Sequence, residues 1–189
     1  MKFLSIITLF SSISLLVSFL SQPSFAEVLC EIDGNYESPS PTYRRLNLEG
    51  FGISVDIPEN YRVMLKQDRS VEILHPNDYQ FLECIANGGI AQYHTGRYSE
   101  SIRLIENNHS EGLKELILDI YHGDLKTYFS YENSRIPGYI IVSESGYSMT
   151  FLGTIPDQSK LLEVSIRCDC EVELQDLTNF LSRITLLNQ

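Results

Sequence analysis

The chain has 189 residues, 43% of them hydrophobic, and its 25 acidic and 14 basic side chains give a net charge of −11 at neutral pH. Phosphate backbones and anionic lipid surfaces repel such a chain, so the composition argues against nucleic acid and favours a protein partner with a basic surface. The alternative is that the acidity only keeps the protein soluble.

Residues 1–26 have the pattern of a signal peptide. Lys2 is their only charge, an apolar run follows to Leu20, and Ser24 and Ala26 are small residues at the two positions that a signal peptidase reads. We expect cleavage after Ala26 and export to a periplasm, a lumen or the extracellular space. An uncleaved membrane anchor is the alternative, because the run approaches the length that spans a bilayer. No second run of that length follows, so we expect no membrane span in the mature chain.

An irregular arm is expected at residues 27–46 and a single domain at residues 47–189. Gly, Asn, Ser and Pro dominate the end of the arm, as in a linker. Ile53, Val55 and Ile57 then alternate with polar residues, which is typical of a half-buried strand. Short apolar runs between turn residues predict three more strands, at residues 61–65, 71–74 and 79–86.

The second half of the chain combines two helices with four strands. Helical spacing of apolar residues predicts one helix over 110–121 and a second near the C-terminus, where Leu174, Leu177, Leu181 and Ile184 share a face. Between them, short strands are predicted at 126–131, 139–143, 149–154 and 161–166. The segment 90–107 fits either a strand or a helix. The order predicts an α+β fold, in which an antiparallel sheet of short strands, arranged as meanders and hairpins, is packed by two amphipathic helices.

Four cysteines remain in the mature chain: Cys30, Cys84, Cys168 and Cys170. An even number in an exported protein predicts two disulfides, with three possible connectivities. Cys168 and Cys170 would point to the same face of a continuous strand, so we favour each of them reaching a distant partner, Cys30 or Cys84. The alternative is a metal or redox site at Cys168 and Cys170, although metal-binding cysteine pairs usually have wider spacing.

A resemblance to a known family appears in the first predicted hairpin. The segment Gly50 to Tyr61 ends an apolar strand in Ile-Pro-x-x-aromatic, and Val71 to Pro76 follows as a strand and stop. Both are similar to the opening of PsbP-like domains, and the closing helix after four strands is similar too. The resemblance implies a non-enzymatic extrinsic subunit or assembly factor on the lumenal side of a photosynthetic membrane.

The sequence contains no clear catalytic, metal, phosphate or cofactor motif. No two of the four histidines have the spacing that places a ligand pair on a helix. The nearest approach to a serine elbow, Gly146 to Thr150, has the wrong last residue and fits a turn entering a strand. We therefore predict no cofactor, no metal site and no catalytic residue, and we lean towards a protein that is not an enzyme.

Tyrosines are abundant in the second half of the chain, and four of them form our candidate partner surface: Tyr128, Tyr131, Tyr139 and Tyr147. Tyrosine is enriched at protein interfaces, but cross-strand packing also favours aromatic residues. Our leading hypothesis is an exported, disulfide-stabilised binding or assembly module that acts on another protein, possibly at a membrane complex. The alternatives are a small exported hydrolase that uses carboxylates and a metal-binding protein that uses Cys168 and Cys170.

Overall fold

The computed structural model describes residues 28–31, 37–91, 98–107, 112–132, 136–155, 159–168 and 170–187. Its centre is a seven-stranded sheet in which every neighbouring pair is antiparallel. In spatial order the strands are β4 (Arg62–Leu65), β5 (Val71–Leu74), β7 (Tyr98–Glu106), β11 (Lys160–Cys168), β10 (Ser148–Thr154), β9 (Gly138–Ser143) and β8 (Leu125–Tyr131). The predicted signal peptide lies outside the described residues.

A second, three-stranded sheet has the order β12 (Ile184–Leu186), β3 (Ile53–Pro58) and β2 (Tyr43–Leu48). A 3-10 turn (Glu49–Phe51) and Gly52, whose φ of 68° is left-handed, connect β2 to β3. Residues 43–46, which we had assigned to the irregular arm, therefore belong to a paired strand. Alternation alone did not mark β2, because arginines and an asparagine interrupt its apolar residues.

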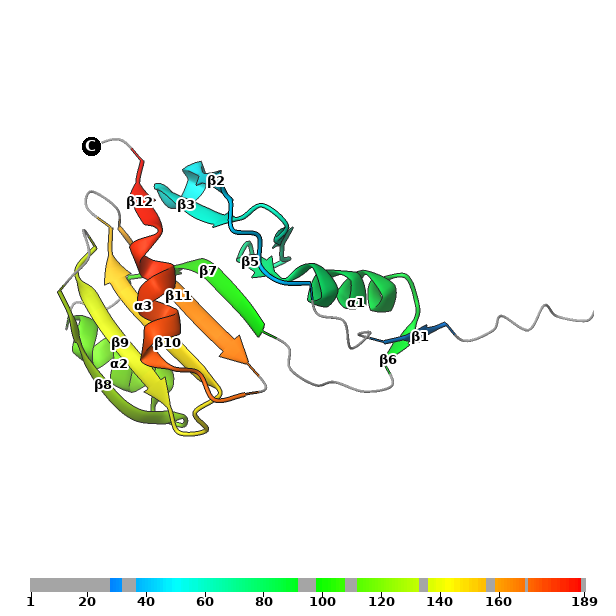
Figure 1. The fold of residues 1–189 in the computed structure, drawn as a ribbon. Coiled ribbons are helices and arrows are strands. Elements are labelled where there is room, and N and C mark those ends of the chain that lie inside the picture. Colours follow the sequence, from blue (N-terminus) through cyan, green and yellow to red (C-terminus); the bar gives the residue numbers. More distant parts are fainter. Residues whose placement is uncertain are drawn as a thin grey trace, which may run out of the picture.

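Two layers pack on opposite faces of the large sheet (Figure 1). Helix α3 (Leu174–Ser182) and the three-stranded sheet share one core with the even-numbered residues of β7 and β11, including Ile102 and Val164. Helix α2 (Leu113–Tyr121) covers the other face through Leu116 and Ile117. The predicted α+β class, the largely antiparallel sheet and the two amphipathic helices are confirmed.

The predicted strand at residues 79–86 is wrong, because this segment belongs to helix α1 (Pro76–Ala86). Pro76 stands at the first turn, where its missing N–H costs nothing, and the side chain of His75 accepts a hydrogen bond from the backbone N–H of Asn77. Phe81 is buried on the inner side of the helix. We had interpreted Pro76 as a break, whereas it begins a helix.

Helix α1 is fastened to the N-terminal segment by a disulfide between Cys30 and Cys84. The same region holds a parallel pair of short strands, β1 (Leu29–Cys30) and β6 (Ile90–Ala91). A Cβ atom at Gly89 would overlap the sulfur atoms of both cysteines, so glycine is required where the chain leaves the helix. Within the described residues, no helix has both the length and the apolar character needed to cross a membrane.

The second disulfide joins Cys168 to Cys170, so the four cysteines are bonded as predicted but with a different pairing. We had expected each of these two cysteines to reach a distant partner. That expectation assumed a strand running through both of them. Strand β11 instead ends at Cys168, and Cys170 lies in a bend beyond the strand. The change of direction brings the two sulfur atoms together.

Candidate functional site

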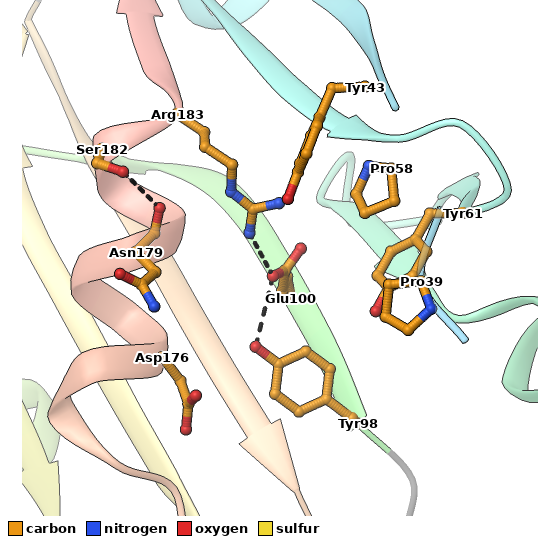
Figure 2. Close-up of a pocket in the computed structure, with 10 residues that line it drawn as sticks. All are labelled: Pro39, Tyr43, Pro58, Tyr61, Tyr98, Glu100, Asp176, Asn179, Ser182 and Arg183. Carbon is orange, nitrogen blue, oxygen red and sulfur yellow. Dashed lines mark hydrogen bonds and ion pairs between the residues drawn. The ribbon is translucent and has the colours of Figure 1, made fainter. Parts of the chain in front are cut away.

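A cavity of about 430 Å³ opens where β7, α3 and the three-stranded sheet meet, and we call it the Glu100 cavity. Its lining residues are Pro39, Tyr43, Pro58, Tyr61, Tyr98, Glu100, Asp176, Asn179, Ser182 and Arg183. Figure 2 shows Glu100 in the middle of this group, with Arg183 and Tyr43 on one side and Tyr98 on the other. Segments far apart in the sequence thus converge on one carboxylate.

The position of Glu100 in the sheet explains its burial. Its partners in register are Ile73 on β5 and Ile166 on β11. Strand alternation directs Glu100 to the same face as Ile102, which belongs to the core beneath α3. Only 2% of Glu100 is exposed, so its carboxylate stands on an apolar floor.

The hydrogen bonds of Glu100 are unevenly distributed between its two oxygens. Oε1 accepts from Arg183 Nη2 at 3.0 Å and from the Tyr98 hydroxyl at 3.4 Å. Oε2 is buried and has no hydrogen-bond partner among the described residues. Burial raises the pKa of Glu100 from 4.5 to about 7, because the loss of hydration outweighs the attraction of the Arg183 guanidinium.

Two aromatic rings hold the Arg183 guanidinium beside Glu100. Arg183 follows the last turn of α3, and its guanidinium carbon lies 5.1 Å from the centre of the Phe180 ring and 5.7 Å from that of Tyr43. The Arg183 carbonyl also accepts a hydrogen bond from Asp56 N of β3. A planar guanidinium stacks well on aromatic rings, so its position is well defined before any ligand binds.

The tyrosines give the cavity neutral hydroxyl groups and aromatic surface. Burial is the main cause that raises the pKa of Tyr61 to about 12, and burial raises the pKa of Tyr98 as well. Both phenols therefore keep their protons at physiological pH. Tyr43 differs in being 54% exposed, which places it at the entrance.

Asp176 brings a second carboxylate to the Glu100 cavity. It lies in the first turn of α3 and accepts a hydrogen bond from Glu173 N at 3.1 Å, as one half of a capping box. The negative charge of Asp176 adds to the causes that raise the pKa of Glu100. With both carboxylates ionised, two negative charges face the single positive charge of Arg183.

A second buried glutamate, paired with a partly exposed arginine, lies on the opposite face of the large sheet. Glu163 on β11 receives hydrogen bonds from Arg103 at both oxygens, at 2.6 and 2.9 Å, and the Tyr121 hydroxyl donates to Oε2 at 2.5 Å. Arg103 and Glu163 are direct cross-strand partners. Both oxygens of Glu163 therefore have donors within the protein, whereas the described residues supply Glu100 with donors at one oxygen only.

The four tyrosines that we singled out from the sequence lie in separate places. Tyr128 and Tyr139 pack edge to face beneath α2, and Tyr131 packs on Phe151 on the other face. Tyr147 is 57% exposed and lines a different cavity of about 500 Å³ with Lys66 and Arg167. The structure thus brings together Tyr128 and Tyr139 but separates them from Tyr131 and Tyr147.

The alternative of a metal site at Cys168 and Cys170 is contradicted, because both thiols are consumed in a disulfide and the described residues include no free cysteine. The described part of the chain also contains no group of three His, Cys, Asp or Glu residues placed to hold a metal ion.

Sequence reasoning missed the residues of the Glu100 cavity. One signal was present: if residues 98–102 form a strand, Glu100 shares a face with Ile102, and a carboxylate on an apolar face is unusual. We had left that segment open between strand and helix. Tyr43, Tyr61 and Arg183 carry no comparable signal, because only tertiary packing brings them to β7.

Comparisons with known proteins identify no family. No protein-family model matches the chain, and no curated protein matches it. Among solved structures, the Saccharomyces cerevisiae Ran-binding protein Mog1p matches with a TM-score of 0.45 and 11% identity, covering 80% of this chain and 97% of that one. The solution structure of the cyanobacterial PsbP protein CyanoP from Synechocystis matches with a TM-score of 0.42 and 11% identity, covering 81% of this chain and 96% of that one. The chain thus has a faint structural resemblance to PsbP. The first hairpin predicted from the sequence is wrong, because β3 pairs with β2 and β12 whereas β4 pairs with β5 in the other sheet.

Proposed function

We propose that the chain is an exported, disulfide-stabilised, non-catalytic module that binds a basic segment of another protein at the Glu100 cavity. The observation that carries the proposal is the content of this cavity, in which two carboxylates and three tyrosines surround a single arginine. The two disulfides support the exported location, because such bonds persist in oxidising compartments.

Charge favours a basic partner. The chain has a net charge of −11, and the lining of the cavity keeps an excess of one negative charge when Glu100 is ionised. Complementary charge accelerates encounter and selects partners, and dissolved salt weakens it. We therefore expect association that falls as the salt concentration rises.

The tyrosines favour a macromolecular partner. Tyrosine supplies a large contact area with few rotatable bonds, and it is enriched among the residues that dominate binding energy at interfaces. Tyr43 stands exposed at the entrance, where a partner would touch it first.

Site-specific photocrosslinking in the native compartment tests the proposal. A photoreactive phenylalanine would replace Tyr43 at the cavity, Tyr147 in the alternative tyrosine surface, or Leu118 on the exposed side of α2 as the control. We expect an adduct from position 43 alone, through a peptide of net positive charge, and less of it at high salt. Equal adducts from position 118, or an acidic crosslinked peptide, would contradict the proposal. An adduct from position 147 alone would show that the partner binds near Tyr147 and not at the Glu100 cavity.

A small hydrolase is the second candidate, because Glu100 and Asp176 line one cavity and the pKa of Glu100 lies near 7. The geometry is less favourable to catalysis than to binding, since Oε1 is bound by Arg183 and Oε2 is covered. Assays with chromogenic esters and glycosides decide the point. A turnover that disappears in both Glu100→Gln and Asp176→Asn would favour the enzyme.

A further inference from the structure

We infer that the Glu100 cavity recognises a lysine side chain of the partner, whose ammonium group donates a hydrogen bond to Oε2 of Glu100. The inference rests on the proposed function and names the chemical group that the site selects.

The first argument is the unpaired oxygen of Glu100. A buried carboxylate oxygen without a donor is costly, and native proteins rarely keep one. The buried Glu163 in the same sheet shows the usual outcome, with donors at both of its oxygens. Figure 2 shows the second oxygen of Glu100 directed away from the Arg183 and Tyr98 contacts, towards the space between Tyr43 and Tyr61. A donor from outside would complete the pair.

The second argument separates lysine from arginine. A guanidinium binds a carboxylate best through two parallel hydrogen bonds, one to each oxygen. At Glu100, Arg183 already occupies Oε1, so a second guanidinium would reach only Oε2. An ammonium is a compact charge that needs no fork of acceptors, so one oxygen is enough for it.

The third argument is the set of charged and aromatic groups around Oε2. Three groups act on the charge of Glu100: Arg183 from the end of α3, Asp176 from its first turn, and Tyr98 from β7. Tyr61 and Tyr43 add aromatic rings to the lining. Asp176 compensates the charge of Arg183, so an incoming cation meets no net repulsion. The tyrosine rings offer faces that attract a cation.

A partner's ammonium can reach the buried Oε2 only if a side chain of the lining moves, and Tyr43 is the one that we expect to move. Oε2 is covered at present, and Tyr43 is the most exposed aromatic residue of the lining. The guanidinium carbon of Arg183 lies 5.7 Å from the centre of the Tyr43 ring, and a cationic side chain of the partner could take the place of this cation–π interaction.

The test uses the whole protein labelled with ¹³C at glutamate carboxyl carbons, and two probes, Nα-acetyl-lysine amide and Nα-acetyl-arginine amide. NMR follows the titration of Glu100, assigned with Glu100→Gln, and Glu163→Gln is the matched control for a buried glutamate. We expect the lysine probe to lower the pH at which Glu100 titrates, and the arginine probe to leave it almost unchanged. Since Glu100 ionises near pH 7, the affinity for the lysine probe should rise about tenfold between about pH 6 and pH 8.

Equal effects of both probes, or none from either, would overturn the inference. The titration itself is measured on the wild type, and Glu100→Gln serves only to assign the signal. Should position 43 crosslink to a basic partner while the lysine probe leaves Glu100 unmoved, the inference fails and the proposed function stands. If crosslinking at position 43 also fails, both the inference and the proposed function are wrong.

Discussion

Arg183 and Glu100 are 83 residues apart in sequence, and a hydrogen bond of 3.0 Å joins Arg183 Nη2 to Glu100 Oε1. The contact links the end of helix α3 to the start of strand β7, and both residues line the Glu100 cavity. It neutralises one oxygen of a buried carboxylate and leaves the other without a donor within the described chain. We therefore expect this one pair to affect the free energy of unfolding, its pH dependence and the choice of ligand.

The pH dependence of stability should report on Glu100. Its pKa is about 7 in the folded protein and near 4.5 when exposed, so the folded state holds the proton more tightly. This contribution is complete below about pH 4.5 and is lost as the pH rises through 7. Urea unfolding at about pH 5 and pH 8 should differ by about 3 kcal/mol more in the wild type than in Glu100→Gln. Glu106→Gln, at an exposed strand end, should behave as the wild type. An unchanged pH slope in Glu100→Gln would contradict the assignment.

Removal of Arg183 should lower the free energy of unfolding, and the additional change Glu100→Gln should restore most of it. Arg183→Met leaves a buried carboxylate with only the long contact from Tyr98, and we expect a loss of about 3 kcal/mol in unfolding free energy at about pH 8. Glu100→Gln combined with Arg183→Met should recover most of it, since no buried charge remains. A double-mutant cycle by urea unfolding measures the coupling. Additive effects of the two changes would show that the pair is not coupled.

Much of the fold followed from local sequence patterns. Strand β5 was predicted with its observed bounds, and β3 and α2 within a few residues, because alternation and helical spacing report directly on which face is buried. Helix α1 was missed because Pro76 has two local meanings, the end of a strand or the first turn of a helix. Only the surrounding packing of Phe81 and Cys84 decides between them.

The candidate site was far less predictable. The Glu100 cavity joins side chains from β2, β7 and α3, and no local pattern reports which distant segments meet. The disulfide pairing failed for a related reason, since it depended on where β11 ends. A pattern of alternating residues predicts the face of a strand well but its last residue poorly.

The two disulfides should contribute unequally to stability. The bond between Cys30 and Cys84 spans a sequence separation of 54 residues, and that between Cys168 and Cys170 spans 2. In the chain-entropy account, the longer loop stabilises by about 4 kcal/mol and the shorter by less than about 2 kcal/mol. Urea unfolding of the two double serine variants measures both. A larger loss from Cys168→Ser with Cys170→Ser would show that the short bond has a role beyond chain entropy.

Two tyrosines that donate to buried glutamates should differ in their energetic contribution. Tyr121 donates to Glu163 at 2.5 Å, whereas Tyr98 donates to Glu100 at 3.4 Å, near the limit for a hydrogen bond. A short bond to a charged acceptor contributes about 2 kcal/mol, and a long one much less. We therefore expect Tyr121→Phe to lower the unfolding free energy by about 2 kcal/mol at about pH 8, and Tyr98→Phe by less than about 1 kcal/mol.

Each of these changes removes only a hydroxyl, so the aromatic packing is preserved and each variant is the control for the other. The comparison also tests the unequal pairing of the two carboxylates. Glu163 loses one of its donors in Tyr121→Phe, while Glu100 keeps its contact with Arg183 in Tyr98→Phe. Equal losses would mean that the Tyr98 contact is stronger than its length indicates. In that case Oε1 of Glu100 would hold two effective hydrogen bonds, from Arg183 and Tyr98, and the two glutamates would differ only in the donors at their second oxygens.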